Sequence, residues 1–215
     1  PLMIVGLLQV MNRQISVVVL GSISGPEAVA AYYPASRISD FATLGLLGIN
    51  AALAPHIAVM FREGRKEQLQ ATLTKAAAIS FASTGAIVLA GLVLAAPLLG
   101  LFGGVAGEGA AALRILLAAQ LLVAATGSVG VVTAMAGQER FAAATAFVVL
   151  ALNYAMLQVL VPGLTTVGAA LATAAAAVIW NLALLARCYR TLGLDPSVLA
   201  LRFSHARSVL ARLRR

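Results

Sequence analysis

The chain has 215 residues, of which 61% are hydrophobic and only 10% are charged, and its mean hydropathy is +0.98. Soluble domains usually carry about 25% charged residues, so this composition argues against a soluble fold. The single cysteine, Cys188, excludes an internal disulfide framework and a cysteine metal cluster. The sequence has no carboxylate pair, nucleophile–base set or metal-ligand spacing. We therefore expect no catalytic residue, no metal, no cofactor and no enzyme activity.

Apolar stretches recur along the chain, and a run of about 20 such residues is long enough to cross a bilayer. They are rich in Ala and Leu and lack strict apolar–polar alternation, which argues against a β-barrel. The predicted helices cover about 1–23, 27–61, 76–101, 110–135, 141–161 and 165–188. The sequence thus predicts an all-α integral membrane bundle of about six transmembrane helices over residues 1–188.

The segments between these helices have the composition of turns and loops. Gly25-Pro26 and Pro162-Gly163 are turn signals, and residues 62–75 form a polar, charged connector. Within the second helix, Pro34 and Pro55 are expected to produce kinks. Residue 1 is a proline inside an apolar stretch with no signal peptide before it. We expect the chain to be the carboxy-terminal part of a longer protein.

Basic residues are distributed unevenly between the two sides that six helices would create. Only Arg114 lies on the side opposite the chain ends, whereas Arg13 and Arg37 fall within helices. Because positive charge stays inside, both ends are expected to face the cytoplasm, in the cytoplasmic (inner) membrane. The net charge of +8 therefore reflects topology, and no nucleic-acid partner is expected. The basic residues on the side of the ends are Arg62, Arg65, Lys66, Lys75, Arg140, Arg187, Arg190, Arg202, Arg207, Arg212, Arg214 and Arg215.

Residues 189–215 form a basic cytoplasmic tail in this prediction. One interpretation is an amphipathic helix over 197–215 that lies on anionic membrane lipids. The other is a disordered basic end that only enforces topology. The apolar residues that would line such a helix, at spacings of 4, 3, 4 and 3, are Leu199, Phe203, Ala206, Leu210 and Leu213.

Polar side chains interrupt the first two predicted helices at mid-membrane. In the first helix, Gln9 and Arg13 share a face and Asn12 lies beside them. An arginine at the bilayer centre costs about 2.5–3.5 kcal/mol on the insertion scale, so it usually faces a cavity or a partner. We therefore expect a substrate-binding face that continues on the second helix. The residues of that helix with the same expected role are Ser36, Arg37, Asp40 and Asn50.

The two arginines are expected at similar depth. Arg13 and Arg37 each lie about 12 residues from the turn at Ser24-Gly25, or about 18 Å at 1.5 Å per residue. Two guanidinium groups against the one carboxylate of Asp40 leave positive charge, which suits an anionic ligand such as a phosphate. In the alternative interpretation, Arg37 and Asp40 form an ion pair with a purely structural role, and Arg13 bonds to carbonyls of neighbouring helices. Other polar residues are expected to bridge helices: Gln120, Asn153, Tyr154, Gln158 and Asn181.

Several segments in this order resemble bacterial polysaccharide flippases, the oligosaccharide/O-antigen exporters of the multidrug/oligosaccharidyl-lipid/polysaccharide exporter superfamily. "NRQISVVVLGSISGPEAVAAYYPASRIS" is similar to their seventh and eighth helices, and "INAALAPHIAVMFREGRKEQLQATL" to the connector that follows. "LGLFGG" and "VTAMAGQER" resemble loops around the tenth helix, and "NLALLARCYRTLGLDPSVLAL" a typical carboxy-terminal end.

This resemblance implies the second lobe of a two-lobe, alternating-access flippase. Its cargo would be a lipid-linked oligosaccharide, a sugar chain on a polyprenyl pyrophosphate. Its partners would be the membrane lipids and the amino-terminal lobe of the same transporter. Two alternatives remain: a drug/organic-cation antiporter of the same superfamily, which would need an unpaired acid, and a non-transporting membrane scaffold protein, which would not need buried arginines.

Overall fold

The computed structural model describes residues 2–95, 99 and 106–200. Within these residues the regular structure is entirely helical, with no strand. The helices follow one another along the chain as α1 (Leu2–Asp40), η1 (Phe41–Thr43), α2 (Leu44–Arg62), α3 (Lys66–Val93), α5 (Ala106–Thr126), α6 (Val129–Met135) and α7 (Glu139–Leu192).

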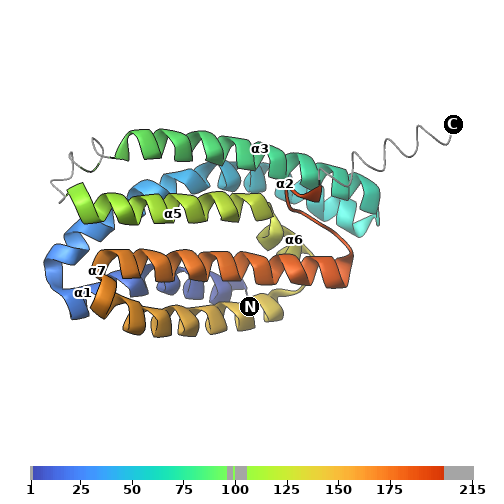
Figure 1. Cartoon of the computed structure of the whole chain (residues 1–215). Coiled ribbons are helices and arrows are strands. Elements are labelled where there is room, and N and C mark those ends of the chain that lie inside the picture. The colour runs from blue at the N-terminus through green and yellow to red at the C-terminus, as the bar shows by residue number, and fades with distance from the viewer. Residues whose placement is uncertain (1, 96–98, 100–105, 201–215) are drawn as a thin grey trace.

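Two of the long helices fold back on themselves (Figure 1). In α1 the reversal is at Gly25, with φ 82° and ψ −179°, a conformation that glycine adopts without steric cost. In α7 it is at Thr165, with φ 44° and ψ −119°. A Cβ at Gly168 would overlap the carbonyl oxygen of Leu160, so glycine allows the two halves of α7 to approach closely. The second half of α1 continues through η1 into α2.

Among the described residues, four continuous stretches are long and apolar enough to cross a membrane: Met3–Arg62, Lys66–Val93, Gly107–Thr126 and Glu139–Leu192. Because the first and last of these reverse at Gly25 and Thr165, the described chain forms six antiparallel rods. We call the end with these two reversals the turn end, and the end with the α2–α3 turn and Leu192 the terminal end (Figure 1). The all-α membrane bundle is thus confirmed.

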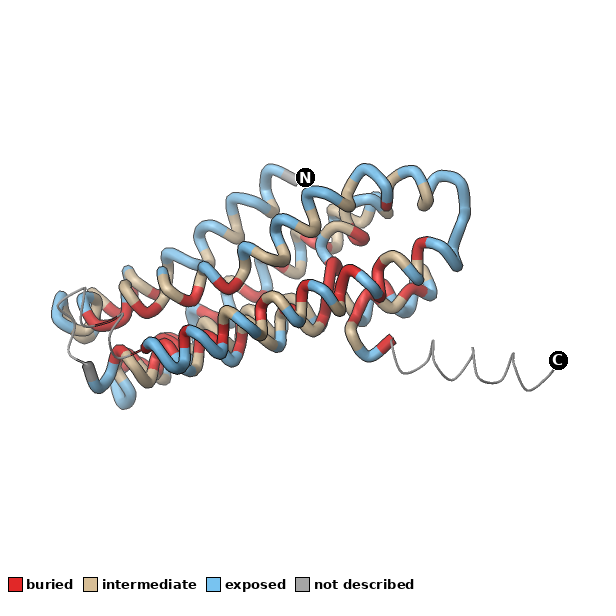
Figure 2. The backbone as a smooth tube through the Cα atoms, turned by 90° about the horizontal axis from the view of Figure 1, so that it is seen from above, coloured by how far each residue is buried: buried red, intermediate tan, exposed pale blue. Residues whose placement is uncertain are grey.

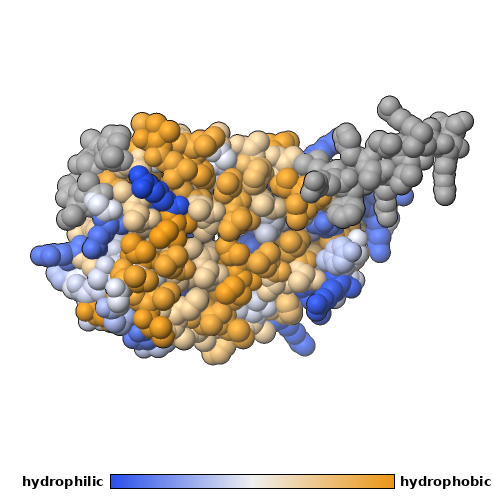
Figure 3. All heavy atoms as spheres, viewed as in Figure 1, coloured by the Kyte–Doolittle hydropathy of each residue, from blue (hydrophilic) through white to orange (hydrophobic). Residues whose placement is uncertain are grey.

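The surface of the bundle is that of a membrane protein. Large apolar side chains project outward, among them Val18 and Leu89, each 66% exposed, and Phe147, 64% exposed. On the face shown in Figure 3 the middle is mostly apolar and hydrophilic side chains gather toward the two ends. The buried residues lie on the inner faces of the helices (Figure 2). The largest buried cluster joins α1, α3, α5 and α7 and includes Leu20, Tyr32, Leu113 and Leu157.

The element boundaries differ from the predicted ones at several points. The polar connector expected over 62–75 is reduced to a short turn, because α3 begins at Lys66 with Glu67 in its first turn, where a carboxylate favours helix formation. The backbone stays helical at Pro34 and Pro55, and the irregular turn falls at Phe41–Thr43 instead.

At the carboxy-terminal end, the last helix runs on to Leu192, past the predicted end of the lobe at 188. The predicted helical stripe of the tail lies mostly at 201–215, outside the described residues.

Residues 193–200, here called the strap, follow α7 and lie against the terminal end of the bundle. The Nε2 of Gln70 donates a 2.6 Å hydrogen bond to the carbonyl of Asp195, and the Asp195 amide donates a 2.9 Å bond back to the Oε1 of Gln70. The Val198 amide donates to the Ala125 carbonyl at 2.9 Å, near the end of α5. The strap therefore joins the start of α3 to the break between α5 and α6.

Candidate substrate cavity

A cavity of about 310 Å³ lies between α1, α2, α5 and α7. Apolar side chains such as Leu46 and Val149 form part of its wall, as in most binding cavities. Among the described residues that line it, the charged ones are two arginines, Arg13 and Arg37, and one aspartate, Asp40. The polar and aromatic residues that complete the lining are Gln9, Asn12, Gln14, Tyr32, Ser36, Ser39, Thr43, Gln120, Thr173, Trp180 and Asn181.

Three hydroxyl groups set the register of the helices around the cavity. The Thr173 hydroxyl donates to the Ala169 carbonyl at 2.8 Å, so its oxygen accepts from Ser16 at 2.7 Å and from Tyr32 at 2.9 Å. Ser16 and Tyr32 are buried, and the apolar cluster of the turn end lies beyond them. Both halves of α1 are therefore tied to the second half of α7 at one level, which closes the cavity toward the turn end.

The second half of α1 contributes a charged pair. The Nη1 of Arg37 lies 3.4 Å from the Oδ2 of Asp40, and the Arg37 guanidinium stacks over the Tyr33 ring at 4.7 Å from its centroid. The Arg37 side chain is 45% exposed and that of Asp40 is 34% exposed. The Arg37–Asp40 pair of the alternative interpretation is therefore present, and both of its members also line the cavity.

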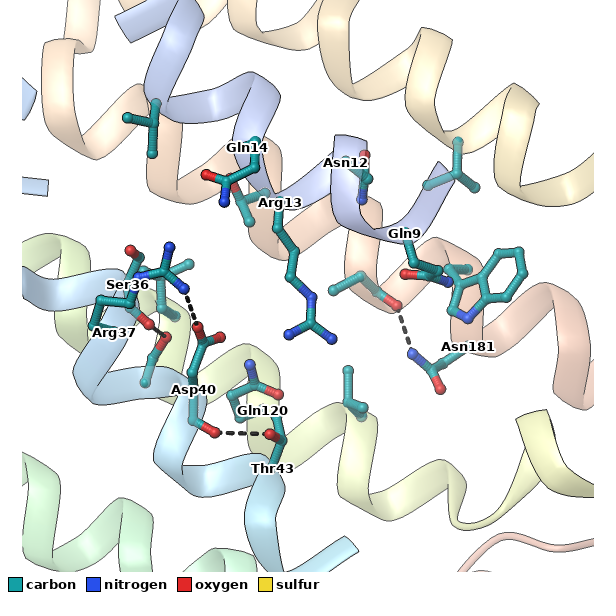
Figure 4. Close-up of a pocket in the computed structure, with 18 of the residues that line it drawn as sticks. Gln9, Asn12, Arg13, Gln14, Ser36, Arg37, Asp40, Thr43, Gln120 and Asn181 are labelled. Atoms are coloured by element: carbon teal, nitrogen blue, oxygen red, sulfur yellow. Dashed lines mark hydrogen bonds and ion pairs between the residues drawn. The ribbon is translucent and has the colours of Figure 1, made fainter. Parts of the chain in front are cut away.

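Arg13 differs from Arg37 in having no acidic partner among the described residues. Within the part of the chain that the structure describes, its guanidinium makes no ion pair and no hydrogen bond. Figure 4 shows the side chain extending from α1 into the cavity, between Asp40 on one side and Asn181 on the other. The alternative interpretation, in which Arg13 bonds to carbonyls of neighbouring helices, is thus not what the described residues show. Its five N–H donors are available to a ligand.

The structure brings together six of the seven predicted site residues. Gln9, Arg13 and Ser36 line the cavity, as do Arg37, Asp40 and Asn12. The Oδ1 of Asn12 also accepts a 2.9 Å hydrogen bond from Asn153, which joins the first half of α1 to the first half of α7. Asn50 lies in α2 outside the cavity lining, and its Oδ1 is buried without a hydrogen-bond partner among the described residues.

Other cavity residues were not predicted as a site. Trp180 and Gln14 were not singled out, and Gln120 and Asn181 were expected only to bridge helices. Asn181 does accept a 3.3 Å bond from Thr126, but it also lines the cavity. The sequence shows that these positions are polar. It does not show which helices pack together, and that packing is what places these side chains near Arg13. Two further expected bridges, Tyr154 and Gln158, are exposed on the outer face of the bundle.

Long apolar helices packed around a polar, positively charged cavity are the architecture of a membrane transporter. The chain belongs to the MatE family, whose sequence model matches residues 1–161. This family lies in the multidrug/oligosaccharidyl-lipid/polysaccharide exporter superfamily, and its members are transporters rather than enzymes. No curated protein and no solved structure matches the chain significantly.

Proposed function

We propose that this chain is the carboxy-terminal lobe of a flippase that moves polyprenyl-pyrophosphate-linked oligosaccharide across the cytoplasmic membrane by alternating access. An amino-terminal lobe of the same transporter would form the facing wall of the cavity. The terminal end of the bundle would face the cytoplasm, in agreement with the basic residues gathered there. The observation that carries the proposal is Arg13 in the cavity, which has no ion-pair or hydrogen-bond partner among the described residues.

The charge balance of the cavity favours an anionic cargo. Arg13 and Arg37 place two positive charges against the one negative charge of Asp40. Guanidinium groups form bidentate, charge-assisted hydrogen bonds with phosphate oxygens, so a pyrophosphate would occupy the donors that Arg13 leaves free. The same groups would compensate the cost of moving this charged headgroup through the membrane.

The drug/organic-cation antiporter is the second candidate, because it fits the family equally well. Two observations favour it: Asp40 is an intramembrane acid, and Tyr32 and Trp180 supply aromatic groups to the cavity wall. However, Asp40 is already paired with Arg37, and Arg13 adds a charge that repels a cation. A membrane scaffold without transport activity would not need an arginine that faces a cavity and has no partner among the described residues.

Transport by the intact transporter in proteoliposomes tests the proposal. One assay follows transfer of the lipid-linked oligosaccharide fraction from the source membranes between leaflets, and the other follows uptake of the organic cation ethidium. We expect the first to depend on Arg13 and the second to be absent. Ethidium uptake that depends on Asp40, without lipid transfer, would establish the antiporter. Absence of both activities in folded protein would support the scaffold.

A further inference from the structure

The described lining of the cavity is chemically divided, and one part of that lining carries no charge. Figure 4 shows Ser36, Arg37 and Asp40 on one side of Arg13, and Gln9 and Asn181 on the other. Trp180 precedes Asn181 in α7 and also lines the cavity. These positions of α7 lie beyond residue 161, where the match to the family model ends.

Helix register places Gln9 and Trp180 at the same level. Ser16 and Thr173 are joined by a 2.7 Å hydrogen bond, and the first half of α1 runs antiparallel to the second half of α7 (Figure 1). Gln9 precedes Ser16 by seven residues, and Trp180 follows Thr173 by seven. Both are therefore two helical turns, about 10 Å, from this bond toward the terminal end. Arg13 lies between the two levels.

Two of the polar groups at this level, those of Gln9 and Trp180, are not used within the described chain, whereas Asn181 donates to the Ala177 carbonyl at 2.9 Å and accepts from Thr126 at 3.3 Å. The Gln9 amide and the indole N–H of Trp180 line the cavity and make no hydrogen bond with any described residue. The partly buried Trp180 side chain packs against a small apolar cluster formed by Val129, Ala142 and Leu184. The indole of Trp180 presents an apolar face and an N–H donor to the cavity, and the uncharged amide of Gln9 presents N–H donors and an oxygen acceptor.

We infer that Gln9, Trp180 and Asn181 form a sugar-ring site, one turn from the pyrophosphate site at Arg13 and closer to the terminal end. This inference rests on the proposed function and adds the part of the cargo that the site recognises. A sugar ring has an apolar C–H face, which packs on the negative face of an indole, and hydroxyl groups that bond to amides. An organic cation would suit the indole but would lie next to Arg13, which repels it.

Tryptophan fluorescence of the intact transporter in detergent tests the inference directly, because Trp180 is the only tryptophan of these 215 residues. The difference between wild type and Trp180→Phe isolates its signal. Two probes are titrated: the lipid-linked oligosaccharide fraction from the source membranes, and polyprenyl pyrophosphate without sugar. We expect only the sugar-bearing lipid to change the Trp180 signal, while both lipids bind in a filter assay that depends on Arg13.

Gln9→Ala provides a second, independent variant. It should weaken binding of the sugar-bearing lipid about fivefold to tenfold, the size of one lost hydrogen bond, and leave binding of the sugarless lipid unchanged. Gln158→Ala and Tyr154→Ala, on the exposed outer face of α7, are the matched controls. Equal binding of both lipids to all variants would refute the sugar site and leave the flippase standing. Binding of ethidium but of neither lipid would refute the flippase and the sugar site with it.

Discussion

Ser16 and Thr173 are 157 residues apart in the chain, and their hydroxyl oxygens lie 2.7 Å apart in the bundle. This contact fixes the first half of α1 against the second half of α7 at the closed end of the cavity. Tyr32 joins the same oxygen of Thr173 at 2.9 Å. One hydroxyl group therefore aligns three of the rods that surround Arg13.

Removal of this hydroxyl should destabilise the bundle. In Thr173→Val the donors of Ser16 and Tyr32 both lose their acceptor, and each buried unpaired group costs about 1–3 kcal/mol. Thr173→Ser keeps the hydroxyl and loses only a methyl group, about 0.8 kcal/mol. Thermal unfolding in mild detergent should rank wild type, Thr173→Ser and Thr173→Val in falling order. Equal unfolding temperatures for the two variants would mean that the hydroxyl does not hold the register.

Arg13→Ala should abolish most transfer of the lipid-linked oligosaccharide. Loss of a hydrogen-bonded charge partner costs about 2–5 kcal/mol, so binding should weaken by roughly 30-fold or more. Arg13→Lys keeps the charge without the bidentate fork and should retain part of the activity. Arg114→Ala removes an exposed arginine of α5 that does not line the cavity, and its activity should stay at the wild-type level. Equal loss in both alanine variants would point to a general effect of basic residues.

Arg37 requires a double substitution because its partner is known. Arg37→Ala alone removes the ion-pair partner of the Asp40 carboxylate, so a loss of transport in this variant could come from a folding defect or from weaker substrate binding. Arg37→Ala with Asp40→Ala removes the pair, and since both side chains are partly exposed we expect the protein to fold, as judged by size-exclusion chromatography. We expect this double variant to transfer lipid poorly. Normal transfer would show that the pair is structural and that Arg37 does not bind the substrate.

Gly127 and Gly137 provide a matched pair for the packing of the strap. Both have positive φ, 68° and 67°, so alanine at either position costs about 1–2 kcal/mol of backbone strain. At Gly127 the new Cβ would also overlap the carbonyl oxygen of Pro196 in the strap, whereas nothing lies within 4 Å at Gly137. Gly127→Ala should therefore lower the unfolding temperature more than Gly137→Ala does. Similar values would indicate that the strap moves aside without cost.

The orientation in the membrane is tested by cysteine labelling in a Cys188→Ala background. Gln68 lies at the terminal end and Gly163 at the turn end, and both are exposed. A maleimide that cannot cross membranes should label Gly163→Cys in intact cells and should label Gln68→Cys only after lysis. The reverse pattern would place the terminal end outside and contradict the orientation drawn from the basic residues.

Much of the fold is readable from the sequence because its signals are local. Apolar runs of bilayer length predict the helices, and Gly25 marks the first reversal correctly. The break at Gly127–Ser128 and the short α2–α3 turn are not predicted. The strap contacts the end of α5 and Gly127, and α3 begins early with Glu67 in its first turn. Local composition does not contain such contacts.

The candidate site divides in the same way. Arg13, Arg37 and Asp40 are predicted because a charged residue within an apolar helix can be recognised from the sequence alone, whatever the tertiary structure. Asn50 shares the polar face of its neighbours in the sequence, but η1 intervenes between Asp40 and α2, and Asn50 does not reach the cavity. Trp180 is apolar enough to pass as a lipid-facing residue. Only the pairing of α7 with α1 turns it toward Gln9.

The strap has a mechanical consequence for any tilting motion of the helices in this bundle. Gln70 holds the backbone of Asp195 through two hydrogen bonds, and Val198 holds the last turn of α5. A tilt of the second half of α7 is therefore transmitted at once to the start of α3 and to the junction of α5 with α6. The break between α5 and α6 is therefore not an independent hinge. We expect the terminal end of the bundle to move as one rigid body.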